Sequence, residues 1–136
     1  GHARQGSIRA PQWKGGGVVF APKPRDYSFK MNRKEKALAI KSALTSRVNE
    51  QKFFVIDNLS LDEIKTKKMK AVLDNLKLTK ALIVLDKKNE NVELSARNLP
   101  KVRTILANSI NVYDILKYDA MVLTKDAVTQ IEEVYA

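Results

Sequence analysis

Four short runs of apolar residues divide the second half of the chain. They cover residues 53–57, 81–86, 102–106 and 120–124. Each run is continuous rather than alternating, which is typical of strands that are buried on both faces of a parallel sheet. Positions inside these runs, such as Val55 and Ile83, are therefore expected in the core.

Helices are predicted around these runs, where apolar residues recur at steps of three and four. A first helix is expected after Asn32, which has capping-box spacing to Glu35. Further helices are expected at residues 66–76, 90–98, 111–118 and 124–135. The inward-facing stripe is predicted to be Ala37, Ile40, Leu44 and Val48 in the first helix, and Val128, Ile131 and Val134 in the last.

Strands that alternate with helices indicate an α/β fold. The order predicts a mostly parallel four-stranded sheet with flanking helices, Rossmann-like in arrangement, with right-handed crossovers. We place this globular domain at residues 32–136, about the size of one ordinary domain.

Residues 1–31 have a different composition and are predicted to form an extended, irregular arm. They hold all 5 glycines and three of the 4 prolines, interleaved with Trp13, Phe20, Tyr27 and Phe29. Glycine and proline disfavour regular structure in such a segment. A solvated disordered linker is the simplest interpretation, but the aromatic residues would have little use there.

Charge separates the two segments further. Up to Arg47 the chain has 11 basic and 2 acidic residues, and from Val48 onward it has 14 basic and 13 acidic residues. Such asymmetry indicates a polyanionic partner, and RNA or DNA is favoured over a membrane because no membrane-spanning or amphipathic arm is visible. The absence of cysteine fits a cytosolic protein. The first residue is not Met, so we expect the chain to be part of a longer protein.

Catalytic chemistry has little support. The triplet at residues 15–17 has no Lys-Ser/Thr after it and so is no phosphate-binding loop. His2 is the only histidine, which argues against a histidine-based triad or metal site. Asp57 and Asp86 end two predicted parallel strands, where α/β enzymes place acids. A small α/β enzyme with a basic tail is thus the rival hypothesis, and loop or helix capping is the more ordinary role of both residues.

The segments ARQGSIRAPQW, GGGVVF and PKPRDYS resemble the extended loop of the bacterial large-subunit ribosomal protein L-four family. LSARNLP, INVYDIL and VLTKDAVTQIEEV are similar to later segments of that family. His2 and Lys14 stand where relatives commonly have arginine. The family's N-terminal portion, with the ascending half of the loop, is absent from this sequence.

The resemblance implies a non-enzymatic structural role in the cytoplasmic ribosome, without a cofactor or metal. In that family a globular α/β domain lies on the outside of the large subunit, and the loop penetrates ribosomal RNA to the wall of the peptide exit tunnel. Implied partners are large-subunit ribosomal RNA and neighbouring large-subunit proteins. Some bacterial members also repress their own operon by binding its messenger leader, and free regulatory RNA binding is therefore a third hypothesis.

The residue types of the arm fit RNA. Arginine and lysine pair with phosphates, Trp13 and Tyr27 can stack on bases, and glycine lets the backbone approach closely. The predicted RNA-binding residues are Arg4, Gln5, Ser7, Arg9, Gln12, Trp13, Lys14, Gly15, Gly16, Gly17, Lys23, Arg25, Tyr27, Lys30, Asn32, Arg33, Lys34 and Lys36.

Overall fold

The computed structural model describes residues 4–135, so His2, discussed above, lies outside the described residues. The chain divides into two units, Gly1–Lys30 and Met31–Ala136. Each unit is described by itself. We call the described residues of the first unit, 4–30, the arm, and the second unit the globular domain.

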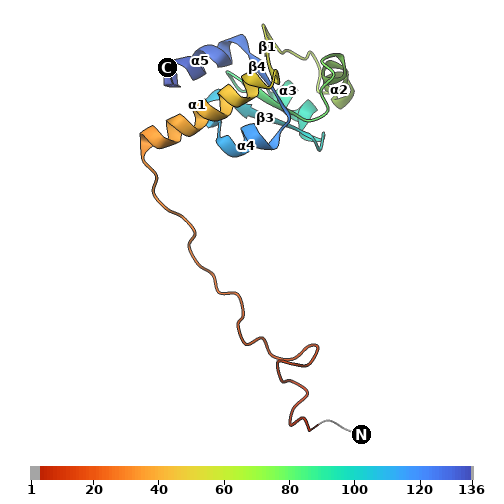
Figure 1. Cartoon of the computed structure of the whole chain (residues 1–136). Coiled ribbons are helices and arrows are strands. Elements are labelled where there is room, and N and C mark those ends of the chain that lie inside the picture. Colours follow the sequence, from red (N-terminus) through yellow and green to blue (C-terminus); the bar gives the residue numbers. More distant parts are fainter. Residues whose placement is uncertain (1–3, 136) are drawn as a thin grey trace. The chain divides into compact units, whose positions relative to one another are not determined.

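The globular domain is built on a four-stranded, entirely parallel sheet (Figure 1). Its strands are β1 (Phe53–Ile56), β2 (Ala81–Leu85), β3 (Val102–Leu106) and β4 (Ala120–Thr124), in the order β1-β4-β2-β3. The helices are α1 (Arg33–Asn49), α2 (Thr66–Asn75), α3 (Glu90–Arg97), α4 (Val112–Lys117) and α5 (Lys125–Tyr135), with a short 3₁₀ turn at Ala107–Ser109. The predicted fold class is confirmed, and the helix and strand boundaries agree to within one residue.

Asparagine residues precede three of these helices and cap their first turns. The backbone N–H of Asn32 donates to Glu35 Oε2 at 3.3 Å, which is the carboxylate half of the predicted capping box. Asn89 Oδ1 accepts from the first turn of α3, and Asn111 Oδ1 accepts from the N–H of Asp114 at 2.8 Å. These bonds satisfy amide groups that have no partner inside the helix.

Two separate cores lie on the two faces of the sheet. On one face, Leu82 and Leu123 pack with buried residues of α1, α4 and α5. On the other face, Ile83 packs with Met69 of α2 and Val92 of α3. The central strands β2 and β4 are fully buried, because helices cover both of their faces.

Three residues that were expected in the core are exposed. Val55 is 52% exposed because β1 is an edge strand with incomplete cover, so the prediction of burial on both faces was wrong for this strand. Val48 in α1 is 53% exposed, and Val134 in α5 is also exposed. The inner faces of these two helices are completed one residue away, by Arg47 and Tyr135 respectively.

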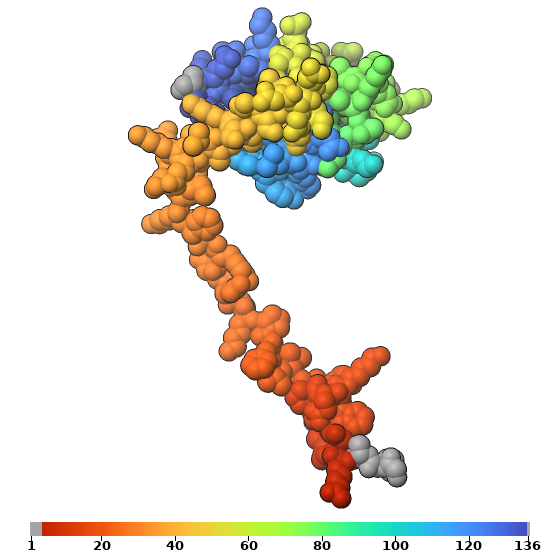
Figure 2. All heavy atoms as spheres, viewed as in Figure 1, coloured from red at the N-terminus to blue at the C-terminus, as the bar shows by residue number. Residues whose placement is uncertain are grey.

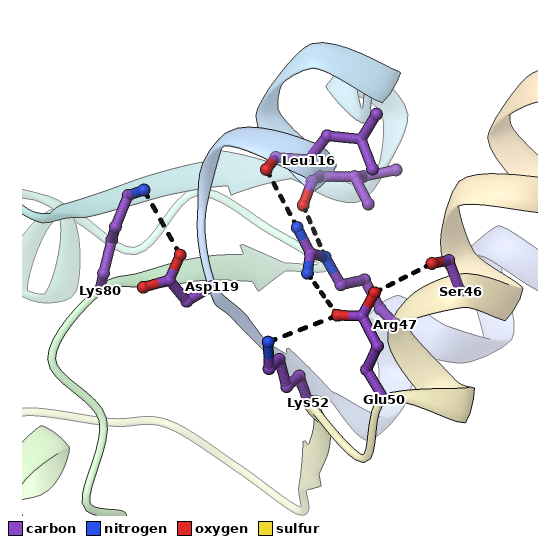
Figure 3. Close-up of polar contacts among 8 residues, drawn as sticks. Ser46, Arg47, Glu50, Lys52, Lys80, Leu116 and Asp119 are labelled. Atoms are coloured by element: carbon purple, nitrogen blue, oxygen red, sulfur yellow. Dashed lines mark hydrogen bonds and ion pairs between the residues drawn. The ribbon is translucent and has the colours of Figure 1, made fainter.

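Arg47 is the least expected member of the inner face, and hydrogen bonds explain its burial (Figure 3). Its Nε donates to the carbonyl oxygen of Ile115 and its Nη2 to that of Leu116, each at 3.0 Å. Its Nη1 lies 2.7 Å from Glu50 Oε2. Hydrogen bonds from Ser46 first, and then from Arg47, hold the pKa of Glu50 below its usual range. The side chain thus ties the end of α1 to the last turn of α4.

Candidate nucleic-acid interface

The arm presents its polar and charged residues to solvent. Residues 4–30 contain turns and bends but no helix or strand, and Figure 1 draws them as an irregular trace. Of the predicted RNA-binding residues, all are exposed except Gly16, which is half-buried. In the space-filling view the atoms of the arm, red to orange, form a narrow, irregular column (Figure 2).

The predicted RNA-binding cations of the arm and of the first turn of α1 are free to meet an external anion. Within residues 4–135, the ion pairs found involve none of the predicted RNA-binding arginines and lysines. Exposed cations without an acidic partner keep their full attraction for phosphate. They are Arg4, Arg9, Lys14, Lys23, Arg25, Lys30, Arg33, Lys34 and Lys36.

Part of the arm has a definite local structure, which we call the Trp13 loop (residues 7–17). It consists of successive turns, in which the N–H of Ala10 donates to the carbonyl of Ser7 at 3.4 Å and that of Trp13 to Ala10 at 3.0 Å. The N–H of Gly16 then donates to the carbonyl of Trp13 at 2.9 Å. Each of these bonds joins residues three apart, so the segment forms consecutive tight turns.

A fourth bond closes the Trp13 loop. The N–H of Gly17 donates to the carbonyl of Arg9 at 2.9 Å, joining positions eight residues apart. Near its start, Arg9 N–H donates to Ser7 Oγ at 3.1 Å, and Gln12 Nε2 donates to Gln5 Oε1 at 2.6 Å. Pro11 and the glycine triplet are ordinary turn signals, but a closed loop was not among the expectations for the arm.

A second local arrangement brings two predicted RNA-binding residues together. The guanidinium of Arg25 lies over the ring of Tyr27, 4.1 Å from its centroid, in a cation–π contact. Between them, Asp26 accepts from the N–H and the hydroxyl of Ser28, each at 2.8 Å. The backbone bond first, and then the hydroxyl bond, hold the pKa of Asp26 below its usual range. The single acid of the arm is thus engaged locally.

The first turn of α1 continues the basic character inside the globular domain. Asn32, Arg33, Lys34 and Lys36 are all exposed. The one acid among them, Glu35, accepts from the backbone and side-chain N–H groups of Asn32. A helix start loaded with cations is unfavourable in isolation, so a negative partner would stabilise it.

The rival pair of aspartates follows two strands that are not neighbours, and the two residues do not line the same cavity. Asp57 follows β1 and Asp86 follows β2, but β4 lies between these strands, which places their ends roughly 9–10 Å apart across the sheet. A cavity of about 330 Å³ at this edge is lined by Asp86, Thr124 and neighbouring loop residues, and Asp57 is not among them. Among residues 4–135, no cluster of acids suited to a metal ion was found.

Comparison with known proteins identifies the relationship. The sequence profile of the ribosomal protein L4/L1 family matches residues 1–134. The chain belongs to the ribosomal protein L4/L1 family. It is 78% identical to the large ribosomal subunit protein uL4 of Lachnoclostridium phytofermentans, 65% to that of Agathobacter rectalis and 58% to that of Thermoanaerobacter pseudethanolicus, each over 136 residues. These matches cover 100% of this chain and 66% of each relative, so the chain spans slightly less than two thirds of their length.

Membership of the L4/L1 family confirms the resemblance seen in the arm and in the later segments. The match covers both the arm and the α/β domain. In the described part of this L4/L1 family chain, no helix is long and apolar enough to cross a membrane.

Proposed function

We propose that this chain is a structural constituent of the large ribosomal subunit and binds large-subunit ribosomal RNA through the arm and the first turn of α1. The observation that carries the proposal is that nine exposed cations, six in the arm and three in the first turn of α1, have no acidic partner among the described residues. Relatives that match the whole chain bear the name of a large-subunit protein. The chemistry of the exposed cations and the family relationship of the chain therefore indicate the same class of partner, ribosomal RNA.

The chemistry of binding divides between charge and planar stacking. The cations neutralise phosphates and release counterions, so affinity falls as salt rises. Trp13 and the stacked pair of Arg25 and Tyr27 offer planar faces to unstacked bases. The globular domain, with its two covered sheet faces, contributes a stable anchor and the basic first turn of α1.

The proposal extends to the chain's place in the ribosome. At roughly 3.3 Å per residue, about thirty fully extended residues would reach at most about 100 Å. The closed Trp13 loop shortens this reach, but the remaining residues of the arm are still long enough to enter an RNA core and approach the exit tunnel. Neighbouring large-subunit proteins are further proposed partners, and the location is the cytoplasmic ribosome. Repression of the chain's own operon through its messenger leader is proposed as a second use of the same RNA-binding residues.

A salt titration of binding to protein-free large-subunit ribosomal RNA tests the proposal. Neutralising about six to ten phosphates predicts a loss of roughly three to five orders of magnitude in affinity between 50 and 200 mM salt. Arg9→Ala should lower the slope of log affinity against log salt by roughly 0.7–0.9. Lys67→Ala is the matched control, because Lys67 is also exposed but lies on α2. Trp13→Ala should cost about 1–3 kcal/mol and leave the slope unchanged.

A charge-neutral arm gives the decisive comparison in the full-length chain. In this variant the single acid of the arm, Asp26, is replaced by asparagine, and its six cations are replaced by glutamine: Arg4, Arg9, Lys14, Lys23, Arg25 and Lys30. It should lose most of the affinity and most of the salt dependence, while the melting temperature of the globular domain stays the same. Unchanged affinity and slope would refute the role of the arm and leave RNA binding to the first turn of α1. Competition by the operon leader tests the regulatory extension separately.

A further inference from the structure

We propose that the Trp13 loop is a recognition element that is already closed before RNA binds, and that Gly16 is the positioning residue that keeps it closed. The inference rests on the proposed function and names how part of the arm recognises RNA. The ligand of the loop would be an RNA segment with an unstacked base and flanking phosphates. The base would stack on Trp13, and the phosphates would pair with the cations of the loop. Most of the arm would order only on RNA, whereas this loop would bind as a preformed unit.

Gly16 occupies a position where a side chain has no room. A Cβ at this residue would overlap the carbonyl oxygen of Ala10, and would lie 2.9 Å from the carbonyl carbon of Ala10 and 3.0 Å from the carbonyl oxygen of Trp13. These are backbone atoms, so they cannot rotate away as the end of a flexible side chain would. The same Ala10 oxygen accepts the N–H of Trp13 at 3.0 Å. Any larger residue at Gly16 must therefore open the loop.

Two other glycines of the arm, Gly15 and Gly6, do not share this steric requirement. Gly15 has φ +84°, a left-handed conformation that other residues rarely adopt, but a Cβ there would meet nothing within 4 Å. Gly6 lies outside the loop, and a Cβ there would also meet nothing within 4 Å. The chain thus offers a matched control for the same chemical change, Gly6→Ala, in the same arm.

The internal bonds also show what the glycines do. The N–H groups of Gly16 and Gly17 donate to carbonyls of Trp13 and Arg9, so the loop itself uses them. Their contribution to RNA binding would then be the shape of the loop rather than direct contacts to phosphate. Trp13 is 44% exposed, against 96% for Phe20 beyond the loop, so the closed loop covers part of the indole and leaves the rest available.

Preformation has a measurable consequence for affinity. When only a fraction of molecules is competent to bind, the apparent affinity falls by that fraction. If Gly16→Ala reduces the closed population to about a tenth, affinity for ribosomal RNA falls about tenfold. The slope of log affinity against log salt should stay the same, because no charge is removed.

The experiment compares Gly16→Ala, Gly6→Ala and the charge-neutral arm variant in the full chain, with protein-free large-subunit ribosomal RNA as the probe. Trp13 is the only tryptophan, so its fluorescence reports on the loop in the free protein. Gly16→Ala should shift the emission to longer wavelength and bind about tenfold more weakly with an unchanged salt slope. Gly6→Ala should match the wild type in both measurements.

Two results would overturn the inference, and a third would overturn the proposed function instead. If Gly16→Ala binds like Gly6→Ala while the charge-neutral arm loses affinity, the arm binds RNA but preformation contributes nothing. If Gly16→Ala weakens binding without changing Trp13 emission, Gly16 acts at the RNA contact and not through the loop. If all three variants bind like the wild type, RNA binding by the arm itself is refuted.

Discussion

Replacing Arg47 tests whether one buried guanidinium holds α1 to α4. The side chain donates to two carbonyl oxygens in the last turn of α4, at Ile115 and Leu116. Carbonyls in the last turn of a helix have no partner within the helix, and a cation there also complements the helix dipole. Arg47→Ala removes both bonds and leaves one fully buried carbonyl without a donor.

The expected loss of stability follows from these bonds. A hydrogen bond to a charged group contributes about 1.5–3 kcal/mol, so two give about 3–6 kcal/mol. The bond to Leu116 is only partly buried, so water can replace some of its contribution. The pair with the exposed Glu50 adds little, because solvent screens it. We therefore expect Arg47→Ala to cost about 3–4 kcal/mol, a large part of the roughly 5–15 kcal/mol that stabilises a small domain.

Urea and thermal unfolding, followed by circular dichroism, measure this loss. Arg47→Ala should lower the melting temperature by roughly 10–20 °C. Arg47→Lys should lose about half as much, because an ammonium group cannot reproduce the planar fork between two carbonyls. The adjacent Val48→Ala is the matched control, since Val48 is exposed, and should change stability by less than about 0.5 kcal/mol. Equal melting of the Arg47→Ala and Val48→Ala proteins would refute the role assigned to the guanidinium.

Two further predictions use the same unfolding assay. Ile83→Asp should prevent folding because Ile83 is only 2% exposed in the central strand β2, whereas Val55→Asp on the edge strand should leave a cooperative transition; loss of the transition in both variants would contradict the difference in burial. Because Ser46 and Arg47 lower the pKa of Glu50, its ionisation stabilises the fold fully above the unfolded value of about 4.5, and this contribution is lost as pH falls through the lower folded pKa. The stability difference between wild type and Glu50→Gln should therefore be constant at neutral pH and shrink below about pH 4.5; a difference independent of pH would count against the bonds to Glu50.

Periodicity was sufficient to predict the fold class because its signals are local. The continuous runs in β2 and β4 and the capping asparagines Asn32 and Asn111 each act over a few residues. What periodicity does not contain is the order of the strands. The exposure of Val55 follows from the edge position of β1, which is set by contacts between distant segments.

Burial of Arg47 could not be predicted for a related reason. An arginine is buried only where acceptors are supplied, and its acceptors are 68 and 69 residues away in the sequence. Val48 looked like the better core residue because hydrophobicity was the only criterion that the sequence offered. The geometry favoured the neighbouring position, where the side chain could reach the end of α4.

In the arm, composition indicated RNA chemistry but not the closure of the Trp13 loop. Glycine at positions 15–17 is compatible with flexibility, close approach to phosphate and tight turns alike. The structure separates these roles, because Gly16 lies against the Ala10 carbonyl and its N–H donates to a carbonyl within the loop. Whether these residues touch RNA stays a prediction of the sequence and of the family relationship.

Arginine takes two opposite roles in this chain, and the difference lies in where its acceptors are. Arg47 has carbonyl acceptors within the fold, so its guanidinium is buried and its contribution is to stability. Arg4 and Arg9 are exposed and form no ion pair among the described residues, so their fixed charge attracts an anion that the chain does not supply. A neutral substitution at Arg47 should accordingly destabilise the globular domain without acting through the RNA contacts of the arm. A neutral substitution at Arg9 should weaken RNA binding and leave the stability of the globular domain unchanged. An RNA-binding arm attached to a stable globular domain predicts that these two effects occur in different variants.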